Sequence, residues 1–474
     1  MINISGIIKT IRNLMRSDKG VNGDAQRIEQ MGWMIFLKIF DDKDIEMELM
    51  DDYYSSPIPN YLQWRNWAAN DEGITGDELL NFVDNELFPT LRELPLDSGN
   101  QRVVLVREVF SGNNNYMKSG TLLRQVINKL NEINFNRSED RHLFGDIYET
   151  ILKELQSAGS SGEFYTPRAL TQFMTAMIEP KLGDMVLDPA CGTGGFLTSA
   201  IELMRGNEVK SVDDRLTLQT TIRGLELKPL PHMLAITNLI LHDIEIPQIE
   251  YTDALATEVS NIRPKDKVDV ILANPPFGGN VVDGMEGNFP ANFRTKESAD
   301  LFLILIIQYL KKGGRAAIVL PDGSLTGEGV KERIRKKLLE DCRLHTIVRL
   351  PNSVFQPYAS VATNLLFFEK GKPTKTVWYY EHQLPAGQKS YSKTKPIQVG
   401  EFEPLKVWWF EREENTQAWQ VDIETIAANG YNLDIKNPHV EEEEHEYSSV
   451  ELLAMLHESF KKSDKLLNKL KKEL

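Results

Sequence analysis

The chain has 474 residues, of which 41% are hydrophobic, so it is long enough to form several domains with substantial cores. Its 54 basic and 69 acidic side chains give a formal net charge of −15, which argues against a protein that holds duplex DNA by itself. Cys191 and Cys342 form no disulfide framework and lie in no metal-ligand spacing, and the longest apolar run, residues 301–307, is too short to span a bilayer. We therefore expect a cytoplasmic protein with no metal site and no membrane segment.

Helical patterning dominates residues 1–155, which we expect to form a helical N-terminal domain. Apolar side chains recur at helical spacing in residues 4–15, 28–40 and 122–130, and no convincing strand pattern interrupts them. The segment QSAGSSG, residues 156–162, is small and polar and predicts a domain boundary. A second domain is expected to extend from there to residue 440.

A glycine-rich turn organises the second domain. Residues 185–187 form an uncharged apolar run, typical of a strand buried on both faces of a parallel sheet, and Asp188 ends it. Gly192, Gly194 and Gly195 follow, and apolar residues then recur at helical spacing. This strand, turn and helix predict a place where bare backbone contacts a nucleotide-like ligand.

The spacing of these glycines argues against NAD and ATP. It does not fit the dinucleotide fingerprint, and no Lys-Ser or Lys-Thr pair follows as a phosphate loop requires. An adenosine ligand without phosphate fits better, with Glu226 at the end of the predicted strand 222–227 as the acid for its ribose hydroxyls. Glu226 follows the turn by more residues than the ribose-binding acid of a dinucleotide fold does, so we expect residues 205–217 to be looped out. The structural alternative is that Asp188 caps the helix and that Glu226 is a solvated strand end.

A second buried strand, residues 268–273, ends in Asn274-Pro275-Pro276-Phe277. The carboxyl ends of strands are where open α/β sheets bind ligands. Two prolines cannot extend a ladder, so they fix a turn in which the Asn274 side chain and the Pro275 carbonyl offer two acceptors to an exocyclic amine. Phe277 offers a flat face to a planar ring, which suits an adenine or cytosine turned out of a duplex. Alone, Asn-Pro would indicate an ordinary turn, but its place after a buried strand favours a site.

Strands and helices alternate beyond this turn. Residues 300–310 and 329–339 predict helices, and residues 315–320, 344–350 and 363–368 predict the last three of seven strands, with an antiparallel edge. This alternation predicts an α/β fold.

The C-terminal tail, residues 441–474, stands apart. An acidic run precedes apolar side chains at helical spacing, and the helix ends in lysines. An exposed apolar stripe on a terminal helix needs a partner, so we expect this helix to bind another subunit.

The motifs DPACGTGG and NPPF together resemble those of amino-group DNA methyltransferases that use S-adenosylmethionine. GEFYTPRAL, residues 162–170, resembles the remaining cofactor segment in the modification (M) subunits of type I restriction-modification systems. The resemblance implies the Rossmann-like S-adenosylmethionine-dependent methyltransferase fold and methyl transfer to adenine N6. The implied catalytic residues are Asn274, Pro275, Pro276 and Phe277. The implied cofactor-binding residues are Glu163, Phe164, Tyr165, Thr166, Pro167 and Arg168 at the methionine end, Asp188, Gly192, Thr193, Gly194 and Gly195 around the amino-acid portion, Glu226 at the ribose and Asp253 at the adenine amine.

The resemblance also implies partners: double-stranded DNA, a sequence-specificity (S) subunit, a second M subunit and a restriction (R) subunit. The sequence shows no target-recognition domain and no helicase or nuclease motif, which agrees with separate subunits. The negative charge likewise indicates a DNA-recognising partner, which we expect the terminal helix to bind.

Three other functions remain open from the sequence. An N4-cytosine DNA methyltransferase carries the same tetrad, a protein-glutamine methyltransferase carries an Asn-Pro-Pro turn in a shorter chain, and a DNA-binding scaffold would retain an idle pocket. A C5-cytosine enzyme needs a cysteine nucleophile. Neither Cys191, inside the glycine turn, nor Cys342, between a helix and a strand, suits that role.

Overall fold

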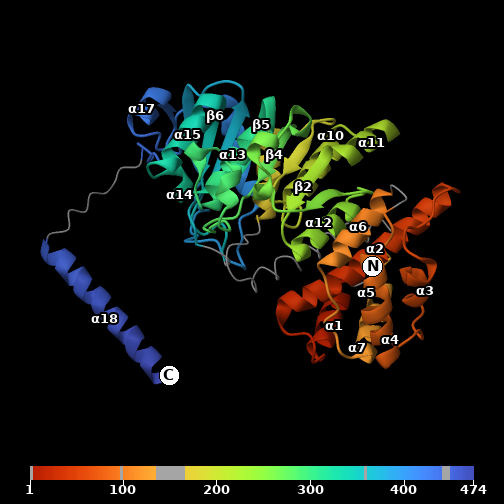
Figure 1. Cartoon of the computed structure of the whole chain (residues 1–474). Helices are drawn as coiled ribbons and strands as arrows, with labels where there is room; N and C mark the ends of the chain where they lie inside the picture. The colour runs from red at the N-terminus through yellow and green to blue at the C-terminus, as the bar shows by residue number, and fades with distance from the viewer. Residues whose placement is uncertain (1–3, 97–99, 135–165, 357–359, 440–448, 474) are drawn as a thin grey trace. The chain divides into compact units, whose positions relative to one another are not determined.

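The computed structural model describes residues 4–96, 100–134, 166–356, 360–439 and 449–473. They fall into two compact units, Met1–Ile435 and Lys436–Leu474. The first unit holds the sheet and every described helix except the last, α18 (Figure 1). No helix among the described residues combines the length and hydropathy needed to cross a membrane.

A nine-stranded sheet forms the centre of the first unit, in the order β3-β2-β1-β4-β5-β7-β6-β8-β9. The strands are β1 (Val186–Asp188), β2 (Ile222–Glu226), β3 (Gln248–Tyr251), β4 (Val268–Ala273), β5 (Leu310–Pro321), β6 (Cys342–Arg349), β7 (Thr363–Lys370), β8 (Thr376–Glu381) and β9 (Ala418–Asp422). The five strands from β3 to β5 pair in parallel, as the buried apolar runs predict.

The sheet has nine strands instead of the seven that the sequence predicted, because β8 and β9 were not predicted. The predicted antiparallel edge is present: β9 lies at one edge of the sheet and runs antiparallel to β8, which is itself parallel to β6. β7 also runs antiparallel to both of its neighbours, β5 and β6, and lies inside the sheet. The interior place of β7 was not predicted, because a strand's hydropathy shows that it is buried and not which strands it pairs with.

Helices cover both faces of the sheet, which explains its uninterrupted apolar strands. In β4, Val270 and Leu272 enter one core, shared with the N-terminal helices, and Ile271 and Ala273 enter the other. The helices after the N-terminal region are α9 (Arg168–Ile178), α10 (Gly195–Asn207), α11 (Val212–Thr221), α12 (Pro229–Leu241), α13 (Ser298–Tyr309), α14 (Asp322–Leu325), α15 (Val330–Asp341), α16 (Glu403–Glu411) and α17 (Ile423–Ala428).

The N-terminal region is helical throughout its described part, as predicted. Its helices are α1 (Ile4–Arg16), α2 (Gly23–Met50), α3 (Trp64–Trp67), α4 (Gly76–Phe82), α5 (Phe88–Arg92), α6 (Gln101–Ser111) and α7 (Gly120–Asn131). The predicted boundary at residue 155 lies outside the described residues, so the division into domains stays a prediction.

α12 joins the N-terminal helices to the sheet (Figure 1). A Cβ added to Gly32 in α2 would lie 2.4 Å from Met233 Cε in α12, and one added to Gly112 would lie 2.3 Å from Pro229 Cβ. A side chain at Gly112 would collide with the rigid Pro229 ring, whereas one at Gly32 would have to displace the flexible end of the Met233 side chain. The N-terminal helices therefore share a continuous apolar core with one face of the sheet.

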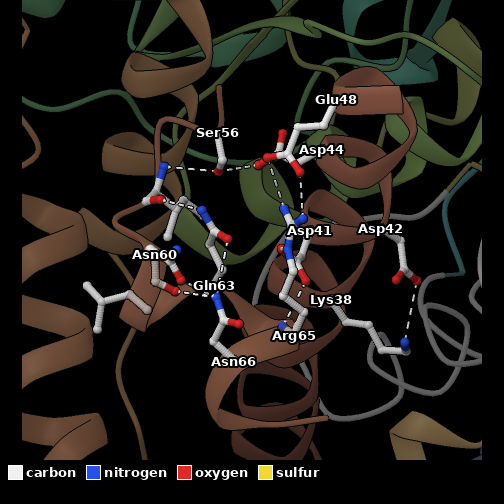
Figure 2. Close-up of polar contacts among 12 residues, drawn as sticks. Lys38, Asp41, Asp42, Asp44, Glu48, Ser56, Asn60, Gln63, Arg65 and Asn66 are labelled. Carbon is white, nitrogen blue, oxygen red and sulfur yellow. Dashed lines mark hydrogen bonds and ion pairs between the residues drawn. The ribbon is translucent and has the colours of Figure 1, made fainter. Parts of the chain in front are cut away.

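A buried ionic network ties α2 to the loop that follows it (Figure 2). Asp44 is fully buried, pairs with Arg102 at 2.6 Å, and accepts hydrogen bonds from the hydroxyls of Tyr54 and Ser56. Arg102 also donates to the Glu245 carbonyl at 3.0 Å, beyond the end of α12. Arg65 forms ion pairs with both Asp41 and Glu48 nearby. A cavity of about 600 Å³ lies beside Arg65 and Glu48, and its lining includes none of the residues predicted to bind cofactor or base.

Replacing Asp44 by alanine should destabilise the protein strongly. The Arg102 guanidinium would remain buried without its carboxylate, and breaking a buried pair in this way costs about 3–5 kcal/mol. Chemical denaturation should show this loss, whereas Lys129→Ala, which removes an exposed pair with Glu132, should change the free energy of unfolding by at most about 1 kcal/mol. Equal effects of the two substitutions would contradict the anchoring role of Asp44.

Residues 205–217 are not looped out as predicted. α10 continues to Asn207, and α11 (Val212–Thr221) occupies most of the extra length. Ser211 and Asp214 form a capping box, in which each side chain accepts from the other's backbone N–H, so a local helix start replaces the expected loop. The Ser-x-x-Asp spacing in the sequence was the available signal.

The second unit contains α18 (Ser449–Glu473), in agreement with the predicted C-terminal helix. Its apolar side chains from Leu452 to Leu467 are about half exposed or more. The acidic run before it, residues 441–444, lies outside the described residues.

Candidate active site

The sheet brings the glycine turn and the Asn274 turn to the same edge. β1 and β4 are parallel neighbours, with Val186 opposite Val270 and Leu187 opposite Ile271. Their carboxyl ends therefore lie side by side, and each strand continues directly into one of the two predicted motifs. Asn274 is partly exposed rather than buried beneath this edge.

The glycine turn provides a cradle of bare backbone. Gly192 and Gly194 have φ of 54° and 80°, in the left-handed region that favours glycine. Among the residues that the structure describes, no atom lies within 4 Å of the position of a Cβ on Gly192, whereas a Cβ on Gly194 would lie 3.1 Å from Leu239 Cδ1. Within the described chain, Gly192 therefore faces open space and Gly194 faces α12. This arrangement fits a ligand that approaches the backbone from the Gly192 side.

Two carboxyl groups border this turn. Glu226 accepts from the Gly192 N–H at 2.9 Å and from the Lys228 N–H at 2.8 Å, so it supports the turn directly instead of facing only solvent. Asp188 is 1% exposed and accepts from the Ala190 N–H, and it does not cap α10, whose N-cap is Gly194. Burial raises the pKa of Asp188 to about 8 and also raises the pKa of Glu226.

Asn274 contacts the predicted cofactor segment. Its Nδ2 donates to Thr166 Oγ1 at 2.9 Å, although the two residues are far apart in sequence. The other polar atom of this amide, Oδ1, is buried and can only accept hydrogen bonds. The two motifs thus meet at a hydrogen bond between their own side chains.

The rest of the tetrad is held by Ser298, the first residue of α13, and by Phe355. Ser298 Oγ donates to the Pro276 carbonyl at 3.0 Å, which fixes the second proline of the turn. Phe277 is 6% exposed and makes an edge-on contact with Phe355, with ring centroids 6.0 Å apart. Its ring is therefore packed in this structure and does not present an open face.

Thr166 and Pro167 lead into α9, whose first residue is Arg168. Arg168 Nη2 pairs with Glu202 Oε1 at 2.7 Å, and this ion pair links α9 to α10. The other three predicted residues of this segment, Glu163, Phe164 and Tyr165, lie outside the described residues.

Asp253 and Thr193 occupy positions beside the same edge. The residue before Asp253, Thr252, donates to the Glu226 carbonyl at 3.0 Å, and Asp253 itself caps a short helix by accepting from Leu255. Thr193 accepts at its carbonyl from Asn238 Nδ2 at 3.0 Å. We did not predict a role for Asn238, although a lone amide in the apolar helical run LAITNLIL was a usable signal.

Comparison with known protein families identifies the family to which this chain belongs. A model described as N-6 DNA Methylase matches residues 139–447, and one described as HsdM N-terminal domain matches residues 4–130. The chain belongs to the N-6 DNA methylase family. The EcoEI methylase subunit of a type I restriction enzyme from Escherichia coli is 57% identical to this family member over 448 residues, covering 92% of this chain and 91% of that protein.

Solved structures agree with the family and the fold. A crystal structure of a modification subunit of a putative type I restriction enzyme from Vibrio vulnificus has a TM-score of 0.84 and 43% identity, covering 92% of this chain and 96% of that one. A structure concerned with complex assembly of the type I restriction-modification system has a TM-score of 0.83 and 34% identity, covering 98% and 97%. The predicted family and the methyltransferase fold with its helical N-terminal region are thus confirmed.

Proposed function

We propose that this chain is the modification subunit of a type I restriction-modification complex and transfers a methyl group from S-adenosylmethionine to N6 of adenine in double-stranded DNA. The observation that carries the proposal is the meeting of the glycine turn, Thr166 and Asn274 at one edge of the sheet. The membership of the N-6 DNA methylase family supports the choice of adenine.

The glycine turn and its two carboxyl groups suit the proposed cofactor. Gly192 leaves its backbone open to a ligand, Glu226 has further lone pairs for ribose hydroxyls, and Asp188 offers a buried carboxylate to a cationic amino-acid portion. S-adenosylmethionine would supply an electrophilic methyl group on a sulfonium. The donor set of the site therefore fits this cofactor.

The tetrad accounts for activation of the target amine. The N6 lone pair of adenine is delocalised into the ring, so the amine is a poor nucleophile. Asn274 Oδ1 and the Pro275 carbonyl would accept its two hydrogens and favour a tetrahedral nitrogen whose lone pair points at the methyl group. Thr166 holds the Asn274 amide in the orientation that this requires.

We propose that recognition of DNA is shared with other subunits. Near the tetrad, Arg294 donates to the Phe289 and Gly287 carbonyls, and Lys296 pairs with Asp283 at 2.6 Å. These cations are already engaged within the chain, and the net charge is −15. An S subunit would supply sequence recognition and phosphate contacts, with a second M subunit and an R subunit completing the complex.

Chromatography of nucleosides from methylated DNA tests the proposal. The chain, co-purified with an S subunit, should incorporate labelled methyl groups into DNA, and digestion should yield N6-methyl-2′-deoxyadenosine as the labelled product. Labelled N4-methyl-2′-deoxycytidine would reassign the target base. Cofactor binding without incorporation into any DNA would contradict the catalytic proposal.

Cofactor binding should depend on pH through Asp188. Because its pKa is raised to about 8, the carboxyl is largely protonated at neutral pH, and a cationic ligand should expel the proton. Affinity should therefore rise between about pH 6 and about pH 8, with proton release that calorimetry in buffers of different ionisation enthalpy measures. In the free protein the same shift stabilises the fold below the ordinary pKa of 3.8, and this stabilisation is lost as the pH rises toward 8.

Asp188→Asn removes the titrating group. Its cofactor affinity should be weaker and nearly independent of pH across the same range, and its binding should release no proton from this site. A variant that retains the slope of the unaltered protein would show that another group is responsible.

A further inference from the structure

The backbone of the glycine turn is held by side chains from two different elements. Glu226, at the end of β2, accepts from the Gly192 N–H at 2.9 Å, and Asn238, in the middle of α12, donates to the Thr193 carbonyl at 3.0 Å. These ties hold neighbouring residues of the segment that adopts the left-handed conformation at Gly192 and Gly194. The conformation of the turn therefore depends on α12 as well as on its own glycines.

α12 meets the turn along one face. Ala235, Asn238 and Leu239 follow the helical i, i+3, i+4 spacing, and a Cβ on Gly194 would lie 3.1 Å from Leu239 Cδ1 and 3.6 Å from Ala235 Cα. Asn238 is 6% exposed, so its amide lies largely in the interior and its bond to Thr193 is partly shielded from water. The turn rests against this face and is oriented by this hydrogen bond.

The opposite face of α12 packs against the N-terminal region. Pro229 and Met233 lie one helical turn apart and fill the spaces left by Gly112 and Gly32. Beyond the end of α12, the Glu245 carbonyl accepts from Arg102, which pairs with the buried Asp44. One face of α12 is therefore held by the N-terminal helices, and the opposite face contacts the glycine turn.

We propose that Asn238 is a positioning residue for the cofactor and that α12 is the rigid support through which the N-terminal helices maintain the binding conformation of the turn. The inference rests on the proposed function, because it assigns Asn238 to the same cofactor site. Asn238 acts on the Thr193 backbone and not on the reacting atoms. Its loss should weaken cofactor binding and leave the chemical step intact.

Asn238→Leu tests this, with Thr237→Val as the matched control. Leucine is close in size to asparagine but has no amide, and Thr237, also buried in α12, donates within its own helix, to the Met233 carbonyl. With the assembled M and S subunits, calorimetric titration with S-adenosylmethionine should show an increase of about tenfold in Kd for Asn238→Leu and less than about twofold for Thr237→Val. The kcat at saturating cofactor should stay within about twofold of the unaltered protein in both.

Asn238→Asp provides a second measurement with a side chain of nearly the same shape. An ionised aspartate cannot donate to the Thr193 carbonyl, whereas a protonated one can. The ratio of its Kd to that of the unaltered protein at the same pH should therefore fall as the pH is lowered. This ratio cancels the contribution of Asp188, which both proteins share.

The outcomes separate this inference from the proposed function. If the unaltered complex does not bind S-adenosylmethionine, the proposed function fails and the inference fails with it. If it binds, but Asn238→Leu behaves like Thr237→Val, or loses kcat instead of affinity, only the positioning role of Asn238 is overturned. A pH-independent ratio for Asn238→Asp would also overturn it.

Discussion

Replacing Asn274 by alanine should abolish methyl transfer while the protein still binds S-adenosylmethionine. The Asn274 side chain is one of the two proposed acceptors for the target amine, and removing one preorganised group of this kind typically lowers kcat by about 10²–10³. Thr166 would lose its partner, but the Gly192–Gly195 turn and Glu226 do not depend on this side chain. A labelled-methyl assay together with a cofactor titration measures both effects.

Asn280→Ala is the matched control for this experiment. Asn280 is exposed, follows the same strand and forms a backbone bridge with Glu297, so loss of its side chain should leave transfer within about twofold. Near-normal methylation by Asn274→Ala would refute the catalytic assignment. Equal losses in the two variants would indicate a general disturbance of the loop.

Deleting residues 446–474 should prevent association with the S subunit. α18 carries exposed apolar side chains, and two of them, Leu453 and Phe460, lie one heptad apart and are each 67% exposed. An amphipathic helix of this kind gains stability by packing its apolar face against partner helices. The truncated chain should still bind cofactor, since the glycine turn belongs to the other compact unit.

Point substitutions make this experiment sharper. Leu453→Asp with Phe460→Asp should disrupt the apolar stripe, whereas Glu458→Ala with Lys462→Ala removes an exposed ion pair from α18 and should leave assembly unchanged. Co-purification and light scattering of the mixed subunits measure assembly. A stable complex formed by the truncated chain would show that the S subunit binds elsewhere.

Local sequence patterns predicted the elements that build the site. The apolar runs before Asp188 and Asn274 are buried strands, and both turns lie at the carboxyl ends where a parallel sheet places them. α9 begins at Arg168, directly after Pro167, whose ring fixes φ and cannot donate a backbone hydrogen bond. Hydropathy and turn chemistry act over a few residues, so the sequence reveals them.

Relations between distant elements were not predictable in the same way. The insertion of β7 between β5 and β6 depends on pairing among strands, and the bond from Asn238 to Thr193 depends on how α12 packs against the turn. The capping box of α11 was a local signal that we overlooked. The roles assigned to Glu163, Phe164 and Tyr165 stay predictions.

The close packing of α2 against α12 has a consequence for protein engineering. Gly32 and Gly112 leave room for Met233 and Pro229, so the two surfaces form a matched set. A chimera that takes its first 134 residues from one relative and the remainder from another should fold well only when these pairs come from the same parent. Recombination points that keep α2, α6 and α12 from the same parent should yield more functional hybrids than points that separate these helices.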